Sequence, residues 1–388
     1  MGGGLMQLVA YGAQDIYLTG NPQITFFKVV YRRHTNFSME AIEQTWDGDA
    51  TSASGRCTAT ISRNGDLVGR MYLELTGTSV TPGPPNPVVD ISSDSITSIE
   101  LEIGGQMIDK QTGHWMNVWS YLTEPNPSGH CGDSSNSTTW DVHLTGTSFQ
   151  NVSGMGGSKA PETDVPLRHY VPLRFWFCGN PGLSLPLIAL QYHEVKVILD
   201  HTIGGATHYV TSPGNKLWCD YIYLDTDERR RFAQVSHEYL IEQVQEGALT
   251  SGQGTLKFNH PVKELIFTGD TVASAVPTGT NIRIKLNGHD RFAGRDYKYF
   301  SRTQIWQHHT GPGGLDCSTT ADGLFNDGIG VYSFALKPEE HQPSGTCNFS
   351  RIDHAEMLAT GGSATKIFAV NYNVLRIMSG MGGLAYSN

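Results

Sequence analysis

The chain has 388 residues, a length that exceeds one average domain and favours two domains of about 150–200 residues. Only 16% of its residues are charged and 44 are glycine, which favours an all-β protein with many turns and long loops. The formal net charge of −10 argues against a protein that wraps nucleic acid, because that function needs clustered lysine and arginine.

Residues 1–24 have mixed polarity and many glycines, and they predict an arm rather than a core element. No basic stretch followed by an apolar one indicates a secretory signal, and no apolar run approaches the ~20 residues of a membrane span. A frayed terminus is the alternative to a docking arm. Docking on a neighbouring molecule is favoured by the apolar residues of this segment, which are Leu5, Leu8, Val9, Ile16 and Leu18.

The first half of the chain then shows the alternation of apolar and polar residues that is typical of strands. In Ser98–Gly104, for example, the apolar residues fall on one face and two glutamates on the other. The other predicted strands are Arg70–Thr76, His169–Cys178, Gln191–Asp200 and Leu217–Leu224. One short helix is predicted at His114–Leu122, where helical spacing favours a core position for Trp115, Val118, Trp119 and Leu122.

The charged segment Leu224–Phe232 breaks the apolar pattern and predicts a linker. Its three arginines, 229–231, stand beside Asp225, Asp227 and Glu228, which favours a salt-bridged linker over a nucleic-acid patch. A second set of strands is predicted after it, at Val235–Val244, Leu256–Phe258, Val262–Phe267, Asn281–Leu286, Val331–Leu336 and Lys366–Ile377. The last of these is long and apolar, as expected of a central strand.

The two halves share one local pattern. An apolar alternation that begins at Ile99 leads to the glycine turn Gly104–Gly105, and a second one that begins at Ile282 leads to Asn287–Gly288. Asn-Gly is a strong hairpin signal. Because the second occurrence lies about half a chain after the first, the pattern predicts two copies of one β-domain.

Long polar segments separate the predicted strands, and such loops are usually functional or mobile. They are Thr81–Pro87, Glu124–Pro166, Thr271–Thr280 and Thr310–Asp322. Asparagines in glycosylation sequons occur at 36, 136, 151 and 348. Asn136 and Asn151 lie in the longest loop, where a glycan could be accommodated. Without a secretory signal, unmodified asparagine is the favoured interpretation for all four.

No catalytic or metal-binding pattern emerges from the sequence. His308 and His309 are adjacent, so in a strand they would point to opposite faces. Neither a phosphate loop nor a serine nucleophile elbow is present. The six cysteines contain no CxxC pair, which argues against a zinc site or disulfide framework and fits a cytosolic product with reduced thiols: Cys57, Cys131, Cys178, Cys219, Cys317 and Cys347.

Six blocks of sequence, in order along nearly the whole chain, carry a family resemblance. They are Leu5–Phe37, Arg168–Val197, Asp227–Gln245, Arg295–Gly311, Gly328–Asp353 and Ala369–Asn388. They resemble the major capsid protein of nucleocytoplasmic large DNA viruses. The resemblance implies an all-β fold of two consecutive eight-stranded jelly rolls, a double jelly roll, with few short helices. It divides the chain into an arm at 1–24, a first roll at 25–224 and a second roll at 225–388.

The resemblance also implies a structural protein without catalysis and without a cofactor. Three copies would form a homotrimer whose six rolls give a pseudo-hexagonal capsomer, and such capsomers tile the icosahedral shell of a large double-stranded DNA virus. The implied partners are neighbouring capsomers, minor capsid proteins and proteins of the inner viral membrane, with no direct contact to nucleic acid. The protein would be made and assembled in the host cytoplasm and would reside in the virion, with Glu124–Pro166 on the outer surface.

Three other functions remain open at this point. A carbohydrate-binding jelly roll would use exposed loop aromatics such as Trp140 and Phe149 to stack on sugars. A cupin-type enzyme would need a histidine cluster, and none is evident. A penton or minor capsid protein is closer in class, but a penton needs one roll and this chain has two similar halves.

Overall fold

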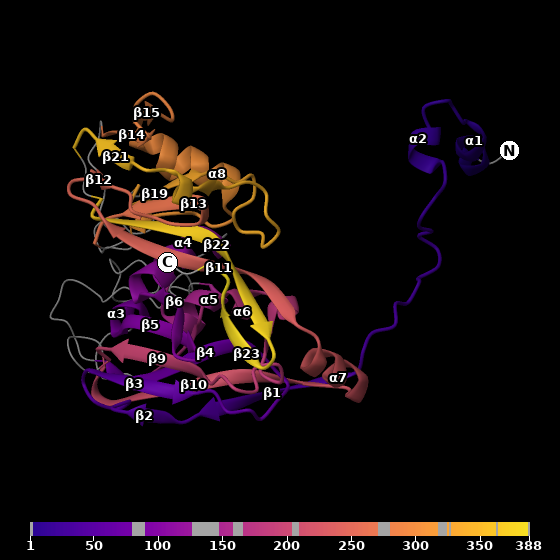
Figure 1. Ribbon diagram of the computed structural model, residues 1–388. Coiled ribbons are helices and arrows are strands. Elements are labelled where there is room, and N and C mark those ends of the chain that lie inside the picture. The colour runs from indigo at the N-terminus through magenta and orange to yellow at the C-terminus, as the bar shows by residue number, and fades with distance from the viewer. Residues whose placement is uncertain are drawn as a thin grey trace, which may run out of the picture. The chain divides into compact units, whose positions relative to one another are not determined.

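The computed structural model describes residues 3–79, 90–125, 147–157, 166–203, 209–270, 280–316, 324–325, 327–361 and 364–386 (Figure 1). By its internal contacts the chain divides into two units, Met1–Asn36 and Phe37–Asn388. The first unit contains two short helices, α1 (Gly3–Val9) and α2 (Ile16–Thr19), and none of its described residues is buried. All the sheets that the structure describes lie in the second unit.

The first half of the second unit folds into two facing antiparallel sheets. Sheet I has the order β1 (Phe37–Gln44), β10 (Tyr209–Leu224), β4 (Leu67–Ser79) and β7 (Pro166–Pro172), with β8 (Leu185–Pro186) beside β4. Sheet II has the order β2 (Trp46–Gly48), β3 (Gly55–Thr60), β9 (Val195–His201), β5 (Ile96–Ile103) and β6 (Gln106–Gln111). In this half the first strand, β1, therefore pairs with the last, β10, and β3 pairs with β9.

The second half repeats this order in a second pair of antiparallel sheets. Sheet III has the order β11 (His237–Ala248), β22 (Lys366–Met378), β13 (Pro261–Thr268) and β19 (Ile329–Ser333), with β20 (Cys347–Asn348) and β23 (Met381–Leu384) beside it. Sheet IV has the order β12 (Gly254–Thr255), β21 (Ala355–Ala359), β14 (Asn281–Leu286) and β15 (His289–Asp290), with β16 (Arg295–Asp296) beside β14. A small pair joins β17 (Leu315–Asp316) to β18 (Leu324–Phe325).

The described helices are short and lie in the connections between strands. In the first half they are α3 (Ile91–Ser95), α4 (Gly113–Thr123), α5 (Ser148–Ser153), α6 (Trp176–Gly179) and the 3-10 turn η2 (Pro181–Leu183). Helix α7 (Thr226–Gln234) joins the halves, and the second half has the π-helical turn η3 (Tyr299–Thr303), α8 (Gln304–His308) and η4 (Phe349–Arg351). The predicted helix at His114–Leu122 is confirmed as α4, whose Thr112 side chain accepts a hydrogen bond from the Trp115 N–H at its start.

Two apolar clusters hold the sandwiches together. The larger fills the space between sheets I and II and continues to Ile266, Phe368 and Val331 on sheet III. The smaller lies between sheets III and IV and includes Leu265 and Phe267. Because alternate residues of β13 and β22 enter different clusters, both faces of these strands are covered. This explains why Val262–Phe267 and Lys366–Ile377 are apolar almost throughout.

The predicted internal repeat is confirmed at its turns. Gly104 and Gly105 have φ values of 60° and 85°, and Asn287 and Gly288 have φ values of 50° and 79°. Two successive residues with positive φ form the kind of tight turn that matches the twist of a hairpin. The turns connect β5 to β6 and β14 to β15, which are equivalent hairpins in sheets II and IV.

Several strand boundaries differ from the prediction. The strand predicted at His169–Cys178 ends at Pro172, and α6 follows, although Phe175 and Phe177 are buried as expected. The strand predicted at Gln191–Asp200 begins only at Val195, and Tyr192 is 75% exposed. Leu256–Phe258 is not a strand, and the strand predicted at Val331–Leu336 ends at Ser333. At Phe175, Phe177, Leu256 and Phe258 apolar side chains reach the core from outside a strand, which alternation alone cannot distinguish from a strand.

The charged segment predicted as a linker contains a helix that the sequence did not predict, and one of its arginines pairs with Asp66 of the first roll. Segment Leu224–Phe232 contains most of α7, which begins after Asp225. Arg229 Nε lies 3.0 Å from an Asp66 carboxylate oxygen, whose partner oxygen accepts the Leu224 N–H at 2.9 Å. Of the predicted loops, Thr81–Pro87 lies outside the described residues, as do most of Glu124–Pro166 and Thr271–Thr280 and part of Thr310–Asp322.

Candidate assembly surfaces

The seam between the two sandwiches is built around helix α4. Its Trp115 ring lies 5.1 Å from the Phe368 ring of β22, and its Trp119 ring meets His309 edge-on at 6.2 Å. Trp115 is 2% exposed, so the expectation of a core position is confirmed. Figure 1 shows α4 at the boundary between the sandwiches, next to β22. A helix face of one roll packed on a sheet face of the other is therefore how this chain joins its two halves.

The end of α4 is also tied to the second half through the backbone. The Gly311 N–H donates to the Leu122 carbonyl at 2.7 Å, and the Thr310 hydroxyl donates to the Thr123 carbonyl at 2.8 Å. A Cβ atom at residue 311 would lie 2.4 Å from the Tyr121 carbonyl oxygen. Glycine is therefore required here for the two backbones to approach each other.

Edge strands β6 and β11 form a second, polar part of the seam. The Val244 N–H donates to an Asp109 carboxylate oxygen at 3.2 Å, and the Gln243 side-chain amide donates to the Ile108 carbonyl. Burial raises the pKa of Asp109 to about 6, although hydrogen bonds from Gln111 and backbone amides oppose the rise. These contacts satisfy exposed edge groups that would otherwise be free to pair with another chain.

His309 is the centre of a buried charged cluster near the same seam. Its Nε2 lies 3.0 Å from a Glu264 carboxylate oxygen and its Nδ1 lies 3.0 Å from a Glu339 oxygen. Burial alone would lower the pKa of His309, but the two glutamates outweigh it and raise the pKa to about 9. His308 ends α8 and His309 follows it with extended backbone, so the two histidines are not neighbours in a strand. Nothing in the sequence signals this cluster, since its members are far apart along the chain.

The residues predicted to form a docking arm are exposed. The exposed fractions of Leu5, Leu8, Val9, Ile16 and Leu18 range from 56% to 86%. Farther along the same unit, Phe26 and Phe27 are 86% and 98% exposed. So many exposed apolar side chains on one short segment are unusual for a surface that faces only water. Docking on a partner stays a prediction.

The predicted glycosylation positions divide between described and undescribed residues. Asn151 lies in α5 and is exposed, whereas Asn136 lies outside the described residues. Trp140, named for the sugar-binding alternative, also lies outside them. Phe149 is not an exposed loop aromatic, because it packs against the larger apolar cluster and the Arg174 guanidinium lies 5.3 Å from its ring centre. This removes one of the two aromatic residues on which the sugar-binding alternative depended.

Within the described part of the chain, no group of three or more His, Cys, Asp and Glu side chains is placed to hold a metal ion. Nor is any helix there long and apolar enough to cross a bilayer. Cys57, Cys178, Cys219 and Cys347 are free thiols, and burial raises the pKa of Cys57 and of Cys178 to about 12. These thiols are therefore protonated at neutral pH and serve as small apolar side chains.

Both sandwiches match capsid families in sequence. Residues 25–225 match the family described as "Major capsid protein N-terminus", and residues 228–383 match "Large eukaryotic DNA virus major capsid protein". The chain belongs to the major capsid proteins of large eukaryotic DNA viruses. The major capsid protein of Pyramimonas orientalis virus is 50% identical, and that of Paramecium bursaria Chlorella virus 1 is 39% identical; each alignment covers all of both chains.

Solved structures agree with this assignment. A chain of the PBCV-1 virus capsid superimposes with a TM-score of 0.76 at 33% identity, covering 94% of this chain and all of the other. The Faustovirus major capsid protein superimposes with a TM-score of 0.61 at 11% identity, covering 95% of this chain and 94% of the other, a likeness of fold alone. The predicted double jelly roll is confirmed, and the two sandwiches are its two rolls. This capsid protein is a component of the virion, and its relatives are structural proteins.

Proposed function

We propose that three copies of this capsid protein close into a pseudo-hexagonal capsomer and that such capsomers tile an icosahedral shell. The observation that supports this most is the repeat of one strand order, β1-β10-β4-β7 in sheet I and β11-β22-β13-β19 in sheet III. Two equivalent rolls per chain give six equivalent rolls in a ring of three. A closed ring with heterologous contacts then has a near-sixfold outline.

We divide the chain accordingly into an arm at 1–24, a first roll at 25–224 and a second roll at 225–388. The two family matches end and begin at residues 225 and 228, which supports a boundary near α7. The protein acts without catalysis or a cofactor and makes no direct contact with nucleic acid, in keeping with its net charge of −10. The free thiols fit synthesis and assembly in the reducing host cytoplasm.

The capsomer is tested by the mass of the purified full-length protein, measured by light scattering after size exclusion. We expect a species of three times 42.4 kDa that persists on dilution. A monomer at all concentrations would contradict the proposal. A saturable affinity of that monomer for glycans would instead support the sugar-binding alternative.

We propose further that the arm docks on neighbouring capsomers, on minor capsid proteins or on proteins of the inner membrane. Deleting Met1–Gly20 is expected to leave the trimer intact and to impair shell assembly, because no described residue of the arm is buried. The measurements are light scattering for the trimer and electron microscopy for particles in infected cells. Normal shells built from the truncated protein would show that the arm is dispensable.

A further inference from the structure

Helix α4 of the first roll has a counterpart in η3–α8 of the second roll. Each follows the equivalent hairpin, β5–β6 or β14–β15. Two pairs of buried residues align the helices. Val118 (0% exposed) matches Ile305 (2% exposed), and Asn117 (4% exposed) matches Gln304 (5% exposed). The same alignment places Trp119 opposite Trp306 and Trp115 opposite Arg302.

The equivalent helix faces differ sharply in burial. Trp115 and Trp119 are covered by the second roll of the same chain, whereas Trp306 is 81% exposed. The Arg302 side chain is 52% exposed and forms an ion pair with Asp327 at 2.7 Å. Leu336 is 75% exposed, and its carbonyl lies 3.1 Å from the His308 ring, at the end of α8. We call Arg302, Trp306 and Leu336 the α8 face.

The sheet faces differ in the same way. On sheet III, Val331, Ile266 and Phe368 stand in one cross-strand row that belongs to the cluster containing Trp115. On sheet I, the equivalent strands β7, β4 and β10 present Tyr170, Tyr72 and Trp218 on the side opposite the core. All three of these rings are partly exposed.

These three rings form a stacked aromatic surface. The centre of the Tyr72 ring lies 5.9 Å from that of Tyr170 and 6.4 Å from that of Trp218. The Trp218 indole N–H donates to Glu74 at 2.8 Å. On the neighbouring edge strand β1, Phe37 and Met39 are 53% and 55% exposed. We call Tyr72, Tyr170 and Trp218 the sheet I face.

We propose that the α8 face of one copy packs on the sheet I face of a second copy, repeating between chains the seam that α4 and sheet III form within one chain. The proposal rests on the proposed function and assigns its contact surface. A second copy is the occupant because the chain itself demonstrates that these equivalent elements fit each other. An indole and a guanidinium also suit an aromatic surface, through ring stacking and cation–π attraction.

The geometry of such a contact is heterologous, because each copy offers a helix face on one side and a sheet face on the other. Within a chain the first helix face meets the second sheet. Between chains the second helix face meets the first sheet of the next copy. Alternating these two seams uses every face once and produces a closed ring of six rolls when three copies are joined.

The first test replaces Trp306 with alanine in the full-length protein. Because Trp306 is exposed, folding is expected to be unchanged, while trimer association weakens by roughly thirtyfold or more, the scale of an interface hot spot. The matched control is Tyr192→Ala, which removes an aromatic ring that is 75% exposed outside both faces. Light scattering over a dilution series measures both variants. Equal trimer stability in Trp306→Ala and the control would overturn the proposal.

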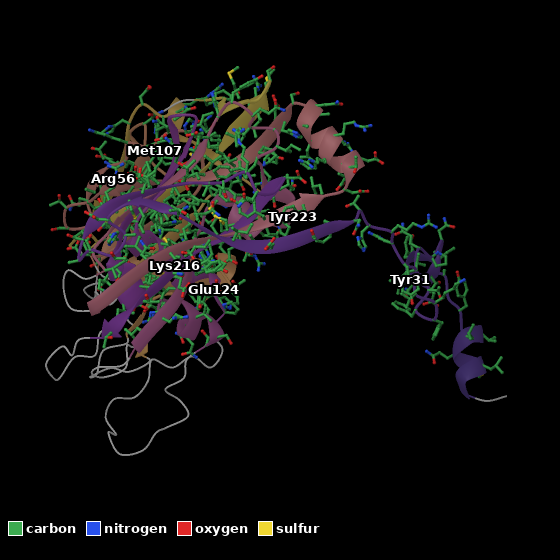
Figure 2. The ribbon with its side chains drawn as sticks, turned by 90° about the horizontal axis from the view of Figure 1, so that it is seen from below. Tyr31, Arg56, Met107, Glu124, Lys216 and Tyr223 are labelled. Carbon is green, nitrogen blue, oxygen red and sulfur yellow. The ribbon has the colours of Figure 1, made fainter. Side chains whose placement is uncertain are left out.

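The second test asks whether the two faces meet across chains. One batch carries Trp306→Cys and another carries Lys216→Cys, a residue of β10 labelled in Figure 2 whose side chain is 51% exposed. The two variants are also co-expressed as a mixture, so that trimers containing both can form, and a short bis-maleimide is expected to give a cross-linked pair only in this mixture. Wild-type protein with the same reagent shows the background from native cysteines. A mixture that contains trimers but gives no more cross-linked pair than this background would overturn the proposal.

The two proposals fail in different ways. If wild-type protein never assembles, the capsomer itself is refuted. If wild-type protein forms trimers that neither Trp306→Ala weakens nor the cysteine pair cross-links, the capsomer stands and the assigned faces are wrong.

Discussion

Helix α4 and its counterpart η3–α8 follow equivalent hairpins, yet α4 is almost wholly buried, whereas α8 has an exposed tryptophan, Trp306. At the matching position of Trp119 and Trp306, the difference in exposure does not come from the residue type. It comes from what lies next to the helix. The second roll covers α4, and within the described part of this chain nothing equivalent covers α8. Comparing the two rolls therefore identifies the α8 face as a surface whose equivalent in the other roll is covered.

A substitution in the buried face of α4 should destabilise the protein most. Trp115→Ala removes a ring that is 2% exposed and packs on Phe368, so it should lower the free energy of unfolding by about 3–5 kcal/mol. Trp306→Ala should change it by less than about 0.5 kcal/mol, because that ring is exposed. Urea denaturation followed by circular dichroism, under conditions that keep the protein monomeric, compares the two. Similar losses of unfolding free energy in the two variants would mean that Trp115 and Trp306 do not differ in burial.

The next effect concerns the charged cluster around His309, beside the seam. The folded-state pKa of His309, about 9, is raised above its ordinary value of 6.5. Its contribution is therefore fully present below pH 6.5 and is lost as the pH rises through about 9. The loss in unfolding free energy should be at most about 3 kcal/mol.

The matched variant for this pH dependence is His309→Gln, which can still hydrogen bond to one glutamate but cannot carry a charge. Its stability should be lower at pH 6.5 and should fall less than that of the wild type between pH 6.5 and 9.5. Unfolding curves at several pH values measure both. Parallel pH profiles for the two proteins would show that His309 is not the titrating group.

The glycine turns of the two equivalent hairpins are positions at which the rolls are alike. Gly105 and Gly288 occupy equivalent turns with φ values of 85° and 79°, and a Cβ atom at either position would meet nothing within 4 Å. Alanine at each should therefore cost only the strain of positive φ, about 1–2 kcal/mol, and the two costs should agree. Thermal unfolding of the two variants measures this. A large difference between them would contradict the equivalence of the turns.

Local sequence patterns predicted many of the strands and helix α4. The alternation in Asn281–Leu286 gave the bounds of β14, and the helical spacing of Trp115, Val118 and Leu122 gave α4. The two glycine turns were readable because positive φ restricts the residues that can occupy them. The resemblance of six blocks to a capsid family then supplied the double jelly roll, which local patterns could not.

Tertiary structure decided which surfaces meet. Glu264 and His309 are far apart along the chain, so their pairing depends on how β13 and the end of α8 are packed. Phe175 and Phe177 reach the core from irregular backbone and a helical turn, whereas alternation predicted a strand. Most of all, Trp119 and Trp306 look alike in sequence, and only the packing of the second roll on α4 leaves one covered and the other exposed. Local patterns report a residue's own backbone state, while burial depends on neighbours distant in sequence.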